Sequence, residues 1–418
     1  MTRSLVLDPI IQGQGADHID RRLEEIVSLT AAIDLEILHS STIRVPKPNP
    51  ATLLGRGWVD DIAQIRDETD ADLIVVNTTL SPAQQRNLER AWHAKVLDRT
   101  GLILEIFGRR ARTREGVMQV DLAHLSYQKS RLVRSWTHLE RQRGGAGFMG
   151  GPGERQIEAD RRMLDEKITR IRRQLEKVVQ TRSLHRESRR KTPFPIVVLV
   201  GYTNAGKSTL FNRLTGAEVL AADLLFATLD PTMRQLKLPS GRPAILSDTV
   251  GFISDLPTEL VASFRATLEE VLEADLILHV RDISSPMVVE EAHDVHTVLE
   301  TIGVSGEIST IDVLNKVDMA NEGASAALYG EHSETPRLAV SALTGTGCDE
   351  LLELIDQTVY PNSEKVRLSL THRDGAAISW LYDHCIVDSR QDTGERIEIV
   401  VHLTPKEYEQ FKKAFPDV

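Results

Sequence analysis

The chain has 418 residues, of which 41% are hydrophobic and 27% are charged, as in ordinary globular proteins. No apolar run approaches the roughly 18 residues of a membrane-spanning helix, and Asp8 comes too early for a secretory signal. Cys348 and Cys385 lack metal-binding spacing, so a cytoplasmic protein without a membrane span is expected. The net charge of −11 argues, on average, against a nucleic-acid partner.

Residues 1–110 are predicted to form a small α/β unit. Strands are expected at residues 36–39, 72–76 and 95–97, and amphipathic helices at residues 59–65 and 82–92. This alternation of strands and helices predicts a parallel sheet.

Residues 111–192 are predicted to form a helical hairpin. One long helix is expected at 113–140, and a second, charged helix at 154–191. Between them lies the glycine-rich segment Gly144–Gly153. The second helix carries a heptad seam of apolar residues, in which Arg161 is expected to fill one core position. The first helix is the simplest partner for this seam, and a homodimeric coiled coil is the alternative.

The charge of this hairpin differs from that of the whole chain. Residues 109–191 hold 22 Lys and Arg but only 10 Asp and Glu, a net charge of +12. A basic block of this size is typical of proteins that bind a polyphosphate. The alternative interpretation is a solvated helix surface with many ion pairs.

The segment Gly201–Ser208 fits the phosphate-binding pattern G-x-x-x-x-G-K-[ST] and directly follows the apolar run Ile196–Val200. A strand that ends in such a turn and opens a helix presents backbone N–H groups to phosphates. Lys207 is expected to reach the β- and γ-phosphates. The hydroxyl of Ser208 is expected to ligate Mg²⁺.

Two further motifs predict a γ-phosphate switch. Thr228, in Phe226–Asp230, is the expected second hydroxyl ligand of Mg²⁺, in a loop that orders on the triphosphate. Asp248–Gly251 follows a predicted strand. Asp248 is expected to hold Mg²⁺ through a water, and the N–H of Gly251 to sense the γ-phosphate.

Asn315–Asp318 has the pattern N-K-x-D after a predicted strand. The carboxylate of Asp318 can accept hydrogen bonds from N1–H and the 2-amino group of guanine, whereas adenine offers no such pair. Backbone of Ser341–Leu343 is expected to line the base. The nucleotide is therefore predicted to be GTP or GDP.

The expected site can be stated residue by residue. Catalytic roles are predicted for Lys207, Thr228 and Gly251, and Mg²⁺ ligation for Ser208 and Thr228. The predicted GTP-binding residues are Gly201, Tyr202, Thr203, Asn204, Ala205, Gly206, Lys207, Ser208, Phe226, Ala227, Thr228, Leu229, Asp230, Asp248, Thr249, Val250, Gly251, Asn315, Lys316, Val317, Asp318, Ser341, Ala342 and Leu343.

Two positions bear on the rate of hydrolysis. Ras-like GTPases place a water-orienting glutamine directly after the D-x-x-G glycine, but this chain has Phe252 there. Slow hydrolysis by the protein alone is therefore expected, with activation by a partner or by another residue of the chain. Asn204 is either a ligand of a K⁺ ion that replaces an arginine finger or an ordinary polar loop residue.

The overall fold class expected is α/β. Residues 193–361 are predicted to form a P-loop GTPase domain with a doubly wound parallel sheet. Residues 362–418 are predicted to form a small α+β tail, with strands at 366–370 and 396–402 and a helix at 405–415.

Three segments make the chain resemble the HflX family of ribosome-associated GTPases, a neighbour of the Obg group. They are Leu97–Phe107, the glycine-rich segment running into Glu154–Arg162, and Phe226–Thr232. The first two lie outside the predicted GTPase domain. Members of this family also carry an apolar residue in place of the glutamine, and Phe252 matches that pattern.

The resemblance implies a factor that binds the large ribosomal subunit and splits stalled or idle ribosomes, notably after heat stress. It also implies some hydrolysis of ATP, and contact of Gly144–Gly153 with ribosomal RNA near the peptidyl-transferase region. A monomer is expected. Two other interpretations stay open: a GTP-regulated factor that modifies or assembles another structured RNA, and a coiled-coil switch without nucleic acid.

Overall fold

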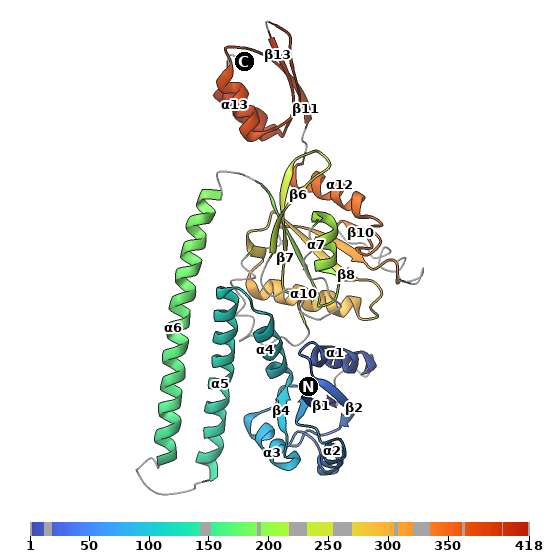
Figure 1. The fold of residues 1–418 in the computed structure, drawn as a ribbon, viewed down its shortest axis with the longest axis vertical. Coiled ribbons are helices and arrows are strands. Elements are labelled where there is room, and N and C mark those ends of the chain that lie inside the picture. Colours follow the sequence, from blue (N-terminus) through green and yellow to red (C-terminus); the bar gives the residue numbers. More distant parts are fainter. Residues whose placement is uncertain are drawn as a thin grey trace.

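Three β-sheets follow one another along the part of the chain that the computed structural model describes, with a long helical hairpin between the first and the second (Figure 1). The described residues are all except 1, 12–18, 143–151, 190–193, 217–231, 254–269, 305–307, 321–334, 362–363, 395 and 417–418. Within them, no helix is long and apolar enough to cross a membrane.

The first sheet has four strands in the order β2-β1-β3-β4, and every neighbouring pair is parallel, as the sequence predicted. The strands are β1 (Arg3–Ile11), β2 (Glu36–Val45), β3 (Leu73–Val76) and β4 (Lys95–Asp98). All four residues of β3 are buried, which is typical of a parallel strand covered on both faces.

Four helices surround this sheet: α1 (Ile19–Ala31), α2 (Arg56–Thr69), α3 (Pro82–Trp92) and α4 (Arg99–Arg110). Helix α3 begins where the sequence predicted, because Ser81 and Gln84 form a capping box and Pro82 opens the first turn. Helix α2 extends beyond the predicted residues. Helices α1 and α4 and strand β1 were not predicted.

The hairpin consists of α5 (Arg114–Gln142) and α6 (Pro152–Arg189), which lie side by side (Figure 1). Ile168 of α6 is buried, and Leu164, Ile171, Leu175 and Val178 are partly buried. The seam of α6 therefore finds its partner within the same chain. Arg161 is exposed, so its predicted core position is wrong: a long charged side chain there reaches solvent instead.

A buried carboxylate attaches the hairpin to the first sheet. Asp98 is fully buried and caps α4 by accepting a hydrogen bond from the N–H of Gly101 at 2.8 Å. From α5, Tyr127 donates its hydroxyl to the same carboxylate at 2.5 Å, and Arg131 forms an ion pair with it. Because a buried charge is stable only when paired and hydrogen-bonded, these contacts fix α5 against the sheet.

The second sheet has six strands in the order β10-β9-β8-β5-β7-β6. Its strands are β5 (Ile196–Gly201), β6 (Thr232–Lys237), β7 (Pro243–Asp248), β8 (Leu276–Asp282), β9 (Ser309–Asn315) and β10 (Arg337–Ala339). The predicted parallel sheet is present in β10, β9, β8, β5 and β7, and the unpredicted β6 pairs antiparallel with β7. The flanking helices are α7 (Lys207–Thr215), α10 (Val288–Ile302) and α12 (Cys348–Val359).

The third sheet is antiparallel, in the order β11-β13-β12, and packs against two helices. Its elements are β11 (Glu364–Thr371), α13 (Gly375–His384), β12 (Ile386–Asp392), β13 (Arg396–Leu403) and α14 (Pro405–Ala414). Arg242, near the start of β7, is buried and donates to the backbone oxygen of His402 at 2.6 Å. It also lies 4.5 Å from the ring centroid of Tyr360, so it connects the second and third sheets.

Candidate nucleotide-binding site

The turn from β5 into α7 requires glycine at two positions. Gly201 and Gly206 have φ angles of 152° and 92°. A Cβ at Gly201 would lie 2.2 Å from the backbone oxygen of Val280, and one at Gly206 would lie 2.2 Å from Nδ2 of Asn315. The strand, glycine turn and helix predicted from the sequence are therefore present, and the free N–H groups at the start of α7 can face an anion.

Lys207, the first residue of α7, is buried at the centre of this turn, with 6% of its surface exposed. Its ammonium donates to the backbone oxygens of Gly201 at 3.0 Å and Tyr202 at 2.7 Å. Burial lowers the pKa of Lys207 to about 8, although the Asp248 carboxylate acts to raise it. A poorly solvated cation in this position would bind phosphate oxygens strongly.

Ser208, in the first turn of α7, lies beside Asp248, the last residue of β7. The hydroxyl of Ser208 donates to Oδ2 of Asp248 at 2.7 Å. Hydroxyl and carboxylate oxygens suit Mg²⁺, which usually takes one or two protein ligands beside substrate phosphates and waters. In keeping with this, the described residues contain no cluster of three or more His, Cys, Asp or Glu that could hold a metal by themselves.

Gly251 lies where the γ-phosphate end of the site is expected. A Cβ at Gly251 would lie 2.9 Å from Cγ2 of Thr203 and 3.2 Å from the ammonium of Lys207. Only glycine allows this close approach. The preceding residues fix the loop, since Thr249 donates to the backbone oxygen of Leu199 at 2.6 Å and Val250 is buried.

Asn315 connects the phosphate end of the site to the base end. Its amide donates to the backbone oxygen of Ala205 at 2.8 Å and accepts from the N–H of Ala342 at 2.9 Å. Nearby, the hydroxyl of Ser341 donates to Oδ1 of Asp318 at 2.5 Å, which orients that carboxylate. Leu343 is 70% exposed beside it.

Two more residues at the base end of the site are held in place by contacts with neighbouring strands. Lys316 has a φ angle of 67° and pairs with Asp282 at 2.9 Å. The N–H of Val317 donates to the backbone oxygen of Val340 at 3.3 Å. The structure thus brings together four of the five predicted segments. Phe226, Ala227, Thr228, Leu229 and Asp230 lie outside the described residues.

Comparison with known proteins matches the sequence of this chain to one family. Family models match residues 20–108 (GTP-binding GTPase N-terminal), 110–189 (GTP-binding GTPase Middle Region), 196–316 (50S ribosome-binding GTPase) and 329–416 (HflX C-terminal domain). The GTPase HflX of Magnetococcus marinus is 47% identical over 96% of this chain and 93% of its own length. The chain belongs to the HflX family of GTPases.

Two further comparisons agree with this assignment or with the fold. The GTPase HflX of Escherichia coli K12 is 46% identical over 86% of this chain and 84% of its own length. The crystal structure of the SsGBP–GDP complex has a TM-score of 0.50 and 24% identity, and covers 86% of this chain and 98% of that one. At this identity the likeness shows the fold alone.

In this HflX chain, Phe252 is part of the hydrophobic core. Its side chain is 1% exposed in an apolar cluster that includes Val200, Ile253 and Val271. Its N–H donates to the backbone oxygen of Gly201 at 3.1 Å, and its own backbone oxygen accepts from the N–H of Thr203 at 2.7 Å. Phe252 therefore braces the phosphate-binding turn, and its ring is held in the core, where it cannot orient an attacking water.

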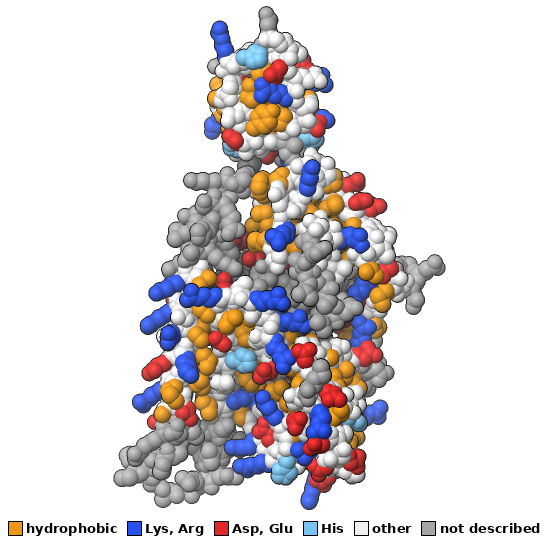
Figure 2. All heavy atoms as spheres, viewed as in Figure 1, with side chains coloured by type: hydrophobic (Ala, Val, Ile, Leu, Met, Phe, Trp, Pro, Cys, Tyr) orange, Lys and Arg blue, Asp and Glu red, His pale blue; other side chains and the backbone are white. Residues whose placement is uncertain are grey.

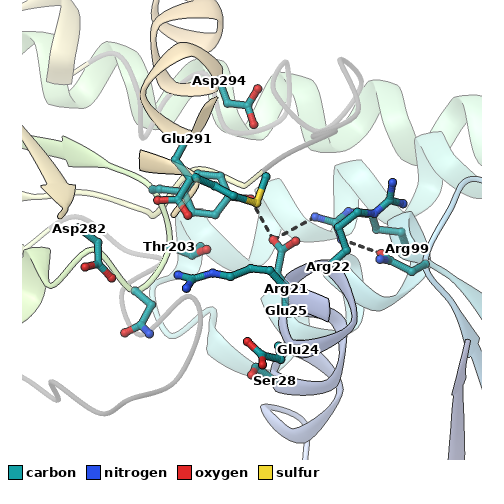
Figure 3. A pocket seen from close by; sticks show the side chains of 14 residues that line it. Arg21, Arg22, Glu24, Glu25, Ser28, Arg99, Thr203, Asp282, Glu291 and Asp294 are labelled. Atoms are coloured by element: carbon teal, nitrogen blue, oxygen red, sulfur yellow. Dashed lines mark hydrogen bonds and ion pairs between the residues drawn. The ribbon is translucent and has the colours of Figure 1, made fainter. Parts of the chain in front are cut away.

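A cavity between this turn and the first sheet was not predicted from the sequence. The cavity, of about 440 Å³, is lined by residues of α1, α10 and the turn itself (Figure 3). The hydroxyl of Tyr202 donates to Glu25 of α1 at 3.0 Å, and Glu25 also pairs with Arg99 at 3.2 Å. Tyr202 and Glu25 are 177 residues apart, so no local pattern could have paired them.

The lowered pKa of Lys207 predicts a pH dependence of nucleotide binding. Phosphate oxygens favour the charged ammonium of Lys207, so bound GTP would raise its pKa. At a pH where Lys207 of the free HflX protein has lost its proton, GTP binding therefore takes up a proton. GTP affinity is expected to be constant below pH 8 and to fall above it, at most about tenfold per pH unit.

This pH dependence can be measured by titration calorimetry at pH 7 to 10, in buffers of different ionisation enthalpy. Proton uptake near zero at pH 7 and rising above pH 8 is expected. Affinity and proton uptake that stay unchanged to pH 10 would show that Lys207 keeps its proton throughout.

Proposed function

We propose that this GTPase binds the large ribosomal subunit through its helical hairpin, and that GTP controls this engagement to split or remodel stalled or idle ribosomes, notably under stress. The observation that carries the proposal is the basic outer surface of α6. Its exposed basic residues in the described range are Arg161, Arg162, Lys167, Arg170, Arg172, Arg173 and Lys177.

This surface is unusual in an acidic protein. Lys and Arg side chains line the edge of the molecule that α6 forms (Figure 2). Over residues 158–178 the exposed acidic residues are only Glu158, Glu166 and Glu176. A row of cations on a rigid helix matches the phosphate backbone of structured RNA, and releases counterions when it binds. Contacts of Tyr127 and Arg131 with Asp98 attach the hairpin to the first sheet.

At the nucleotide site, the proposed GTP ligands are the residues predicted from the sequence, Thr228 included. Lys207 would contact the β- and γ-phosphates and Asp318 the guanine base. Ser208 would ligate Mg²⁺ directly and Asp248 through a water, where the metal would neutralise phosphate charge. With Phe252 in the core, we propose that hydrolysis is slow until a further group supplies the missing function. A K⁺ ion held by Asn204 is one such group, since it would bring a positive charge beside the phosphates.

The organisation proposed is an α/β part (1–110), a basic hairpin (111–192), a GTPase domain (193–361) and a C-terminal α+β domain (362–418). The proposed setting is the cytoplasm, and the proposed form is a monomer. ATP as a second substrate rests on family likeness only.

Neutralising part of the basic surface tests the proposed contact. Changing Arg162, Arg172 and Arg173 together to Gln is expected to weaken binding to purified large subunits and leave GTP binding unchanged. Each lost phosphate contact should also reduce the slope of log affinity against log salt by about one. Co-sedimentation at several salt concentrations measures both quantities.

The matched control changes three exposed arginines of α2 and α3, Arg56, Arg86 and Arg90, to Gln. Equal losses in both triple variants would mean that general charge, not α6, binds the subunit. A wild-type protein that prefers free transfer RNA to large subunits would favour a GTP-regulated factor for other structured RNA.

A further inference from the structure

Helix α1 presents one face to the phosphate-binding turn. Arg21, Glu24, Glu25 and Ser28 all line the cavity beside Tyr202, Thr203 and Asn204. Their spacing of three, four and seven residues places them on one side of the helix. The bond from Tyr202 to Glu25 holds this side against the turn, and Glu25 is itself held by Arg99.

Arg21 lies one helical turn before Glu25 on that same face. Its side chain reaches from α1 toward the turn, into the cavity that Thr203 and Asp282 also line (Figure 3). The guanidinium is near Glu291 as well: burial raises the pKa of Glu291, and the Ser285 hydroxyl and the charge of Arg21 act against that rise. Arg21 is partly exposed, so the side chain can still move.

Of the five carboxylates that line the cavity, three have partners other than Arg21. Asp282 pairs with Lys316 at 2.9 Å, Glu25 pairs with Arg99, and Glu291 accepts from Ser285 at 2.7 Å. Among the residues that the structure describes, Arg21 itself forms no hydrogen bond or ion pair within bonding distance. A cation is thus held at the cavity without being neutralised by a dedicated partner.

Thr203 connects this cavity to the γ-phosphate end of the site. It lines the cavity, and its Cγ2 lies 2.9 Å from the position of a Cβ on Gly251. That same position is 3.2 Å from the ammonium of Lys207. A long side chain that passes Thr203 therefore enters the region where the γ-phosphate would contact Gly251 and Lys207.

We propose that Arg21 is an activating arginine supplied by the first domain of the same chain, which contacts the phosphates of GTP during hydrolysis. This inference rests on the proposed nucleotide site. In the reaction, a water oxygen bonds to the γ-phosphorus while the bond between the γ-phosphorus and the β,γ-bridging oxygen breaks. The electron pair of that bond stays on GDP, and the water proton ends on the released phosphate. The Arg21 cation would stabilise the charge that develops on the bridging oxygen.

The test is single-turnover GTP hydrolysis by full-length protein, with Arg21→Ala and Arg21→Lys compared with wild type. Arg21→Ala is expected to slow hydrolysis on the order of 10³-fold or more, with little change in GTP or GDP affinity. It should also lose the tighter binding of GDP with aluminium fluoride, a mimic of the transition state. Arg21→Lys should restore only part of the rate, because lysine lacks the planar fork of arginine.

The matched control is Arg22→Ala. Arg22 is the next residue of α1 and pairs with the buried Asp8 at 3.3 Å. Its loss tests whether a general disturbance of α1 slows hydrolysis. A rate for Arg21→Ala within about twofold of wild type, or an equal loss in Arg22→Ala, would overturn the inference.

Two further measurements separate the causes of failure. The first compares the rate of GTP hydrolysis in K⁺ and Na⁺ buffers. If hydrolysis needs K⁺ and Arg21→Ala does not slow it, the activating positive charge belongs to a cation at Asn204, and the inference fails. Lys207→Ala in the same assay tests the nucleotide site itself. If Lys207→Ala loses GTP and Arg21→Ala keeps its rate, the proposed site survives and only the role of Arg21 is wrong.

Discussion

Replacing Lys207 with methionine or alanine is expected to abolish measurable GTP binding and, with it, hydrolysis. The ammonium is buried at the centre of the turn from β5 to α7, where it donates to two backbone oxygens. Hydrogen bonds to charged groups contribute about 1.5–3 kcal/mol each, so loss of two phosphate contacts should cost on the order of 10² to 10⁴ in affinity.

Methionine is the sharper of the two changes at Lys207. It keeps most of the volume in this buried position, whereas alanine would also leave a cavity and lower the free energy of unfolding. Calorimetric titration with GTP and GDP measures the affinity, and thermal unfolding confirms the fold. The matched control is Lys237→Met, at an exposed lysine of β6. Methionine at 207 with affinity within about tenfold of wild type would contradict the proposed phosphate role.

Replacing Asp318 with asparagine is expected to change the base that the protein selects. The carboxylate accepts two N–H groups of guanine, but the amide of asparagine presents a donor to one of them. Xanthine has an oxygen in place of the 2-amino group, so it can accept from that amide. Sites built on such hydrogen bonds discriminate by about 10⁴ to 10⁵, so GTP affinity should fall on the order of 10³ or more while XTP affinity rises.

The geometry around Asp318 supports this prediction. Ser341 holds Oδ1 of Asp318 at 2.5 Å, and the side chain is otherwise exposed toward the expected base. Competition between GTP and XTP for the protein measures the preference. The matched control is Asp349→Asn, at an exposed aspartate of α12. An Asp318 variant that still prefers GTP would show that another group reads the base.

The nucleotide site was predictable because its signals are local. Gly201, Lys207 and Asp248 follow apolar strands, and parallel strands bring their carboxyl ends to one edge of the sheet. The two motifs also place glycine at 206 and 251, where a Cβ would be too close to its neighbours. Motif and fold rules together therefore predicted where four of the five segments meet.

Three of the elements that the sequence did not predict were missed for identifiable reasons. Helix α4 is buried from Arg99 to Leu104 and again at Ile106 and Phe107, so over most of its length no exposed polar face marks it as a surface helix. Strand β1 contains Pro9, which argues against a central strand, but only Ser4–Leu7 pairs on both sides and Pro9 lies where β2 alone is the neighbour. Strand β6 is a mostly polar edge strand with little pattern to detect.

The contact of α1 with the nucleotide site could not be predicted at all. It depends on how the first domain packs against the second, and residues as distant as Tyr202 and Glu25 carry no periodic signal. The error at Arg161 has a similar origin. A heptad position was assigned to the core, but the side chain of Arg161 at that position is exposed.

The most direct test of the central proposal is GTP turnover by the full-length protein with increasing amounts of purified large ribosomal subunits. Turnover is expected to be slow alone, because Phe252 lies in the core, and to rise until the added subunits saturate it. Sedimentation of intact ribosomes with the protein and GTP should then show separated subunits. Turnover that large subunits leave unchanged, together with no co-sedimentation, would contradict a GTPase that acts on the ribosome.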